Sequence, residues 1–188
     1  GRPHVIIALG WRGANAPAAS RHLVLRRALA HVKAAGIEVS GLPTIIETVD
    51  GWEVVWERQV DGIPVLGDGV RLSLWKDGSF HAVAAWEHAL APRPTTTIDE
   101  ATARAIAANR FGQWSGGDGA IAVRSARLAF VRPNDAVDPN RPDAPLAEAR
   151  LAWVVTGEPV HPDQRLFKKA EIWLDAGDGS IIGGDLVE

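Results

Sequence analysis

Histidine and carboxylate side chains are the candidates for metal binding or acid–base chemistry, because the chain has no Cys. The six histidines are His4, His22, His31, His81, His88 and His161. His81 and His88, with Glu87 beside the second, form one candidate metal site. Ligands on one face of a strand need an even spacing, so exposed or strand-edge histidines are the favoured interpretation. There is no H-E-x-x-H motif, which excludes a zincin centre.

Other catalytic patterns are also missing from the sequence. Ser115 follows a predicted helix and its neighbouring glycines do not fit G-x-S-x-G, so it is not a nucleophile elbow. No helix begins after residues 67–69 or 177–179, so these Gly-Asp-Gly segments are turns and not phosphate loops. Residues 133–145 offer oxygen ligands for Ca²⁺ without the spacing of a calcium loop, and an exposed acidic loop is favoured. We therefore predict no enzyme activity, no cofactor and no metal site.

Charge and hydropathy exclude two further classes of partner. The net charge is −3 with scattered Lys and Arg, whereas a nucleic-acid site needs concentrated basic residues. No apolar run is long enough to span a bilayer. The run from Val5 to Leu9 is too short for the apolar part of a signal peptide, so we expect no signal peptide in this chain.

Strand patterns dominate the first half of the chain. Apolar and polar residues alternate from Trp52 to Val60, which is typical of a strand with one buried face. Asp61-Gly62 and Asp77-Gly78 separate further alternating runs and are strong hairpin signals. The stretch from Trp52 to Leu90 therefore predicts an antiparallel meander.

Two segments show helical patterns. In residues 17–35, four apolar residues recur at helical spacing: Leu25, Ala28, Leu29 and Val32. In residues 98–111, Thr97 and Glu100 predict a capping box at the start of the helix.

The second helix follows a proline-rich connector at Ala91–Pro94, where we place the domain boundary, giving domains 1–91 and 92–188. Four strand-like runs follow that helix: 120–131, 146–156, 166–174 and 180–186. Each half therefore holds a helix followed by antiparallel strands.

Two parts of the sequence resemble known protein modules. Residues 57–70, which read E-R-Q-V-D-G-I-P-V-L-G-D-G-V, resemble the core motif of the fungalysin/thermolysin propeptide (FTP) domain. Residues 98–107, 151–155 and 171–182 resemble the helix and strands of a PepSY domain. The signature residues, to which the resemblance assigns a structural role, are Gln59, Gly62, Pro64, Val65, Gly69, Trp153 and Asp175.

The resemblance implies an α+β fold of two cystatin-like units, each a helix packed on an antiparallel β-sheet. Both modules occur in the propeptides of secreted thermolysin-type metalloproteases. The resemblance therefore implies a non-catalytic, extracytoplasmic module that inhibits a secreted protease or assists its folding. The alternative is a structural or ligand-binding module of the cell envelope, of PepSY type and unrelated to proteolysis.

Partner binding would involve the end of the chain and two tryptophans. The C-terminal strand of the family leads toward the protease cleavage point, so an inhibitory tail would consist of Asp185, Leu186, Val187 and Glu188. If Trp75 and Trp173 are exposed, they would mark a partner surface. If they face a helix or the other half of the chain, they belong to the core, and this is the favoured interpretation. Docking would occlude the partner through main-chain pairing at a sheet edge.

Overall fold

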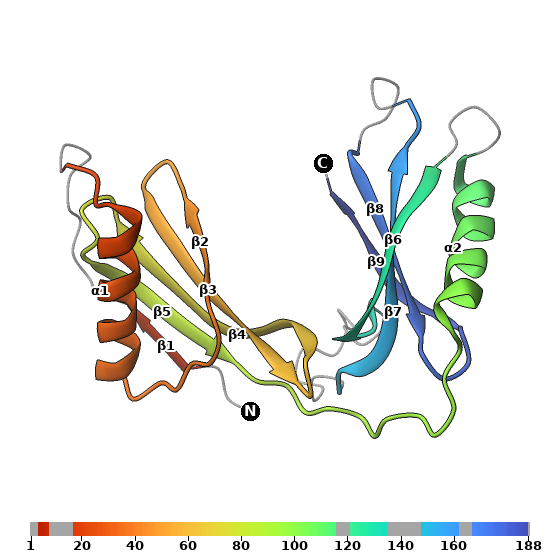
Figure 1. The fold of residues 1–188 in the computed structure, drawn as a ribbon, viewed down its shortest axis with the longest axis horizontal. Coiled ribbons are helices and arrows are strands. Elements are labelled where there is room, and N and C mark those ends of the chain that lie inside the picture. The colour runs from red at the N-terminus through yellow and green to blue at the C-terminus, as the bar shows by residue number, and fades with distance from the viewer. Residues whose placement is uncertain (1–3, 8–16, 116–120, 135–147, 162–166, 188) are drawn as a thin grey trace, which may run out of the picture. The chain divides into compact units, whose positions relative to one another are not determined.

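The computed structural model describes residues 4–7, 17–115, 121–134, 148–161 and 167–187. Within those residues the chain forms nine strands and two helices (Figure 1). In chain order these are β1 His4–Ile7, α1 Arg21–Ala34, β2 Thr44–Glu47, β3 Gly51–Val60, β4 Ile63–Trp75, β5 Phe80–Trp86, α2 Glu100–Ser115, β6 Ile121–Val131, β7 Arg150–Pro159, β8 Lys169–Asp175 and β9 Ile181–Val187.

The chain is divided into two compact units. The first unit comprises Gly1–Val60 and Gly67–His88, and the second comprises Asp61–Leu66 and Ala89–Glu188. The turn after β3 and the beginning of β4 therefore belong with the C-terminal half of the chain.

The predicted fold class, two cystatin-like units each with its own antiparallel sheet, is wrong. The strands form a mixed sheet in the order β1-β5-β4-β6-β7-β8-β9, with β3 pairing to β4 and β2. β4 serves both units, because Val65 near its start pairs in parallel with Phe130 of β6, while its later residues pair antiparallel with β5. Alternation and turn residues indicate neighbouring hairpins but carry no signal for a parallel pairing between distant segments.

In the first unit, α1 covers one face of β3, β4 and β5 (Figure 1). The helix begins after Ser20, whose hydroxyl accepts a hydrogen bond from the Leu23 N–H at 3.3 Å. The buried stripe is Val24, Ala28 and Val32, which are spaced four residues apart, while Leu29 is exposed. The buried face of the helix is therefore shifted by about one residue from the predicted face. The prediction missed it because two apolar stripes lie side by side on this helix. The strand residues buried beneath α1 are Trp52, Val54, Trp56, Val70, Leu72, Leu74 and Val83.

β4 passes very close to β3 at Gly69. The φ angle of Gly69 is 124°, and a Cβ there would lie 2.0 Å from the carbonyl oxygen of Trp56. Both the backbone conformation and the space therefore require glycine. The preceding turn has positive φ at Asp61 and Gly62, as the Asp-Gly hairpin signal predicts.

In the second unit, α2 covers one face of β6, β7 and β8 (Figure 1). Its cap is Asp99, because the Asp99 carboxylate accepts a hydrogen bond from the Thr102 N–H at 2.7 Å. The predicted capping box at Thr97 is therefore wrong by two residues. Hydrogen bonds from the side chain and backbone of Thr102 lower the pKa of Asp99. The buried core beneath α2 consists of Ala103, Ala107, Phe111, Val155, Ala170, Ile172 and Leu174.

Neither of the two described helices is long and apolar enough to cross a membrane.

The close approach at Gly69 can be tested against a second glycine of β4. We expect Gly69→Ala to lower the free energy of unfolding by more than about 3 kcal/mol. The new Cβ would overlap the Trp56 carbonyl oxygen, and alanine would be strained at the positive φ of this position. Gly67→Ala is the matched control, because Gly67 also has positive φ but an added Cβ meets nothing within 4 Å. That variant should lose only about 1–2 kcal/mol. Urea unfolding of both variants measures the difference, and equal losses would contradict the account.

Candidate functional site

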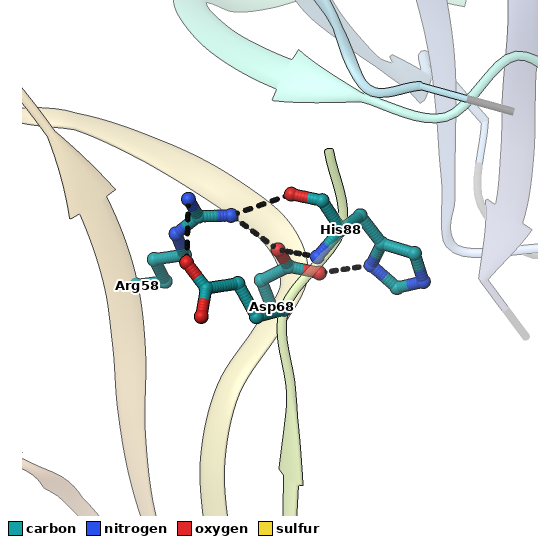
Figure 2. A network of polar contacts seen from close by, with 4 residues as sticks. Arg58, Asp68 and His88 are labelled. Carbon is teal, nitrogen blue, oxygen red and sulfur yellow. Dashed lines mark hydrogen bonds and ion pairs between the residues drawn. The ribbon is translucent and has the colours of Figure 1, made fainter. Parts of the chain in front are cut away.

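A network of polar side chains surrounds Asp68 in the first unit (Figure 2). The Asp68 side chain on β4 has 0% exposed surface. Its Oδ2 accepts hydrogen bonds from Arg58 Nη1 at 3.0 Å and from the His88 backbone N–H at 2.7 Å. Its Oδ1 contacts Nδ1 of the His88 ring. The carboxylate therefore joins β3, β4 and the segment that follows β5.

Arg58 extends this network to solvent. Its Nη1 also donates to the His88 carbonyl oxygen at 2.8 Å, and its Nη2 lies 2.9 Å from Oε1 of the exposed Glu87. A buried carboxylate needs this number of donors, because an unpaired charge in the interior is costly. The arrangement fixes the backbone where the first unit ends. The donors and acceptors of the network are paired with each other.

The candidate metal site at His81, Glu87 and His88 is not assembled. The His88 ring is directed to Asp68, and the His81 ring stacks against Trp75 with 4.3 Å between centroids. In the part of the chain that the structure describes, no group of three or more His, Asp or Glu side chains is placed to hold a metal ion. The calcium candidates in residues 135–147 lie outside the described residues.

A groove of about 450 Å³ lies beside the outer part of β3 in the first unit. We call it the β3 groove. It is lined by Ile37–Ser40, Trp56–Gln59, Gly69–Val70 and Ala85–Glu87. Arg58 and Glu87 of the polar network therefore form part of its wall.

A second groove, of about 620 Å³, lies along β9 in the second unit. We call it the β9 groove. Its lining is mostly apolar and consists of Trp114, Ile121, Asn134, Phe167, Glu171, Ile181 and Gly183–Leu186. Two of the predicted partner-binding residues, Asp185 and Leu186, therefore lie in one groove with side chains from α2, β6 and β8.

The other predicted partner-binding residues do not line the β9 groove with Asp185 and Leu186. Trp75 is half-buried against His81 in the first unit. Trp173 packs on Ala129, Val131, Ala152 and Val154, a cluster separate from the core beneath α2. Val187 ends β9, but its side chain is outside the described part, as is all of Glu188.

The predicted signature residues are divided between the two units. Gln59 and Gly69 lie in the β3 groove, whereas Gly62, Pro64 and Val65 belong to the second unit. Two further signature residues serve the second unit. They are Trp153, whose Nε1 donates to the Ile98 carbonyl oxygen at 3.0 Å, and Asp175, whose carboxylate accepts from the Gly177 N–H at 2.8 Å. These contacts join β7 to the entry of α2 and shape the β8–β9 turn.

Sequence reasoning did not identify the Asp68 network. A signal was present, because Arg58 shares the parity of Trp52, Val54 and Trp56 on β3. A charged residue on an apolar strand face requires a buried partner, and only the fold shows which one.

The network predicts very different effects for the two carboxylates that contact Arg58. We expect Asp68→Ala to lower the free energy of unfolding by about 3 kcal/mol, because it leaves the half-buried guanidinium and the His88 N–H without their shared acceptor. Glu87→Gln is the control on the same guanidinium. Its side chain is 72% exposed, so the loss should stay below about 1 kcal/mol. Similar losses in chemical denaturation would show that the network does not stabilise the unit.

Comparisons with known proteins show a likeness of fold to one solved structure. No family model and no curated protein matches the sequence. Among solved structures, the C-terminal domain of YpeB from Bacillus megaterium has a similar fold, with a TM-score of 0.55 over 94% of this chain and 69% of that one. The sequences are 16% identical, so the likeness is one of fold alone. The chain therefore shares the fold of that domain, while the PepSY and FTP resemblances stay predictions.

Proposed function

We propose that this chain is a non-catalytic, extracytoplasmic module that binds a secreted thermolysin-type protease. It holds an extended segment of the protease along β9 and occludes the enzyme. The likeness of fold to a PepSY-containing protein supports the choice of a binding module over an enzyme.

The open edge of β9 is the observation that carries this proposal. Among the described strands, β9 pairs only with β8 and stands at the end of the sheet order. An unpaired strand edge offers N–H and C=O groups to an added strand, and proteins usually protect such edges. Two backbone groups of β9 have side-chain partners: the Gly184 carbonyl accepts from Asn134 Nδ2 at 2.7 Å, and the Leu186 N–H donates to Asp185 Oδ1 at 2.8 Å. Leu186 on β9 is 58% exposed and Ile181 is 45% exposed, so this edge is apolar as well as open.

The β9 groove gives the added strand its specificity. Side chains alternate along an extended peptide, so those that point toward the groove meet Trp114, Ile121 and Phe167. Glu171 and Asp185 supply the charge of the lining. An apolar segment of the partner therefore fits the groove through both its backbone and its side chains. Occlusion of this kind requires no catalytic group in the module.

The test is inhibition of a purified thermolysin-type catalytic domain by this chain. We expect inhibition by the native chain and a roughly 10-fold or greater loss for Leu186→Glu, which places a charge in the apolar groove. Leu29→Glu is the control, because it puts the same charge on an exposed leucine of α1 in the first unit. Absence of inhibition by the native chain, or an equal effect of both variants, would reject the proposal and favour the alternative of a cell-envelope module.

A further inference from the structure

Part of the β3 edge is also left open. β2 pairs with β3 in antiparallel register, and its first residue, Thr44, lies opposite Val55. Residues Trp56–Gln59 continue β3 beyond that point, and β2 and β4 are the only described strands that pair with it. Ile37–Ser40, which precede β2, belong to no strand and line the β3 groove. An open strand edge beside a groove is a place where one short strand can be added.

The charges in the β3 groove favour a basic occupant. Three carboxylates line it, at Glu38, Glu57 and Glu87, against the single guanidinium of Arg58. Arg58 is already paired with Asp68 and Glu87. Glu38 and Glu57 are exposed, and no described residue forms an ion pair with either. Lys or Arg side chains of a bound peptide would complement this excess of negative charge.

One exposed tryptophan in the groove wall suits a basic peptide. Trp86 is partly exposed at the end of β5 and offers an aromatic face to a cationic side chain.

We infer that the β3 groove binds a basic segment of a protein partner in extended conformation. The segment pairs with β3 beyond the end of β2, and its Lys or Arg side chains contact Glu38 and Glu57. This site lies in the first unit, whereas the proposed protease edge lies in the second unit. The two assignments stand on separate observations, so one can fail without the other.

The direct test uses a synthetic peptide of about six residues in which Lys and Val alternate. Calorimetric titration into the whole chain should detect its binding. The corresponding Glu–Val peptide should not bind, because the groove carries excess negative charge. A Lys–Val peptide with N-methylated backbone amides should also lose binding, since it cannot donate to the β3 edge.

Variants of the chain assign that binding to the groove. We expect the double variant Glu38→Gln, Glu57→Gln to bind the Lys–Val peptide roughly 10-fold more weakly. Glu53→Gln is the matched control, because Glu53 lies on β3 opposite Ile46 of β2 and outside the groove. No binding of the Lys–Val peptide, equal binding of the Glu–Val peptide, or an unchanged affinity of the double variant would each overturn the inference. Binding is measured without protease, so this result is independent of the inhibition test.

Discussion

The burial of one carboxylate, Asp68, constrains the whole end of the first unit. With no exposed surface, it must be matched by donors, and these come from Arg58 on β3 and from His88 beyond β5. The pairing holds three segments of chain in one place at the point where β4 approaches β3 through Gly69. It also occupies the guanidinium of Arg58, which leaves the β3 groove with an excess of negative charge. The need to pair the buried Asp68 carboxylate thereby determines the charge of the β3 groove.

The two grooves share one structural origin, which is a strand edge that the fold leaves open. β9 ends the sheet order, and β2 is too short to cover all of β3. In both places the backbone offers pairing to an extended peptide, and the side chains around it select the peptide. We propose that the β9 groove takes an apolar segment and the β3 groove a basic one. Strand edges of this kind can bind a partner through the backbone without an active site.

The sequence predicted local structure far better than long-range structure. Asp-Gly signals located the hairpin turns, because their backbone conformation depends on the residues of the turn itself. The parallel pairing at Val65 and the donors around Asp68 join segments that are distant in sequence, and no local pattern encodes them. Asp185 and Leu186 were proposed from a family resemblance, and the structure adds the groove around them. The β3 groove was not foreseen, since it depends on where β2 stops.

Hydrogen exchange of the backbone amides is the most direct test of partner docking at β9. The measurement compares the free chain with the chain bound to a thermolysin-type catalytic domain. The account predicts slower exchange in Ile181–Val187, because an added strand pairs with that edge. Complex formation with unchanged exchange in β9 and protection confined to other segments would contradict the account.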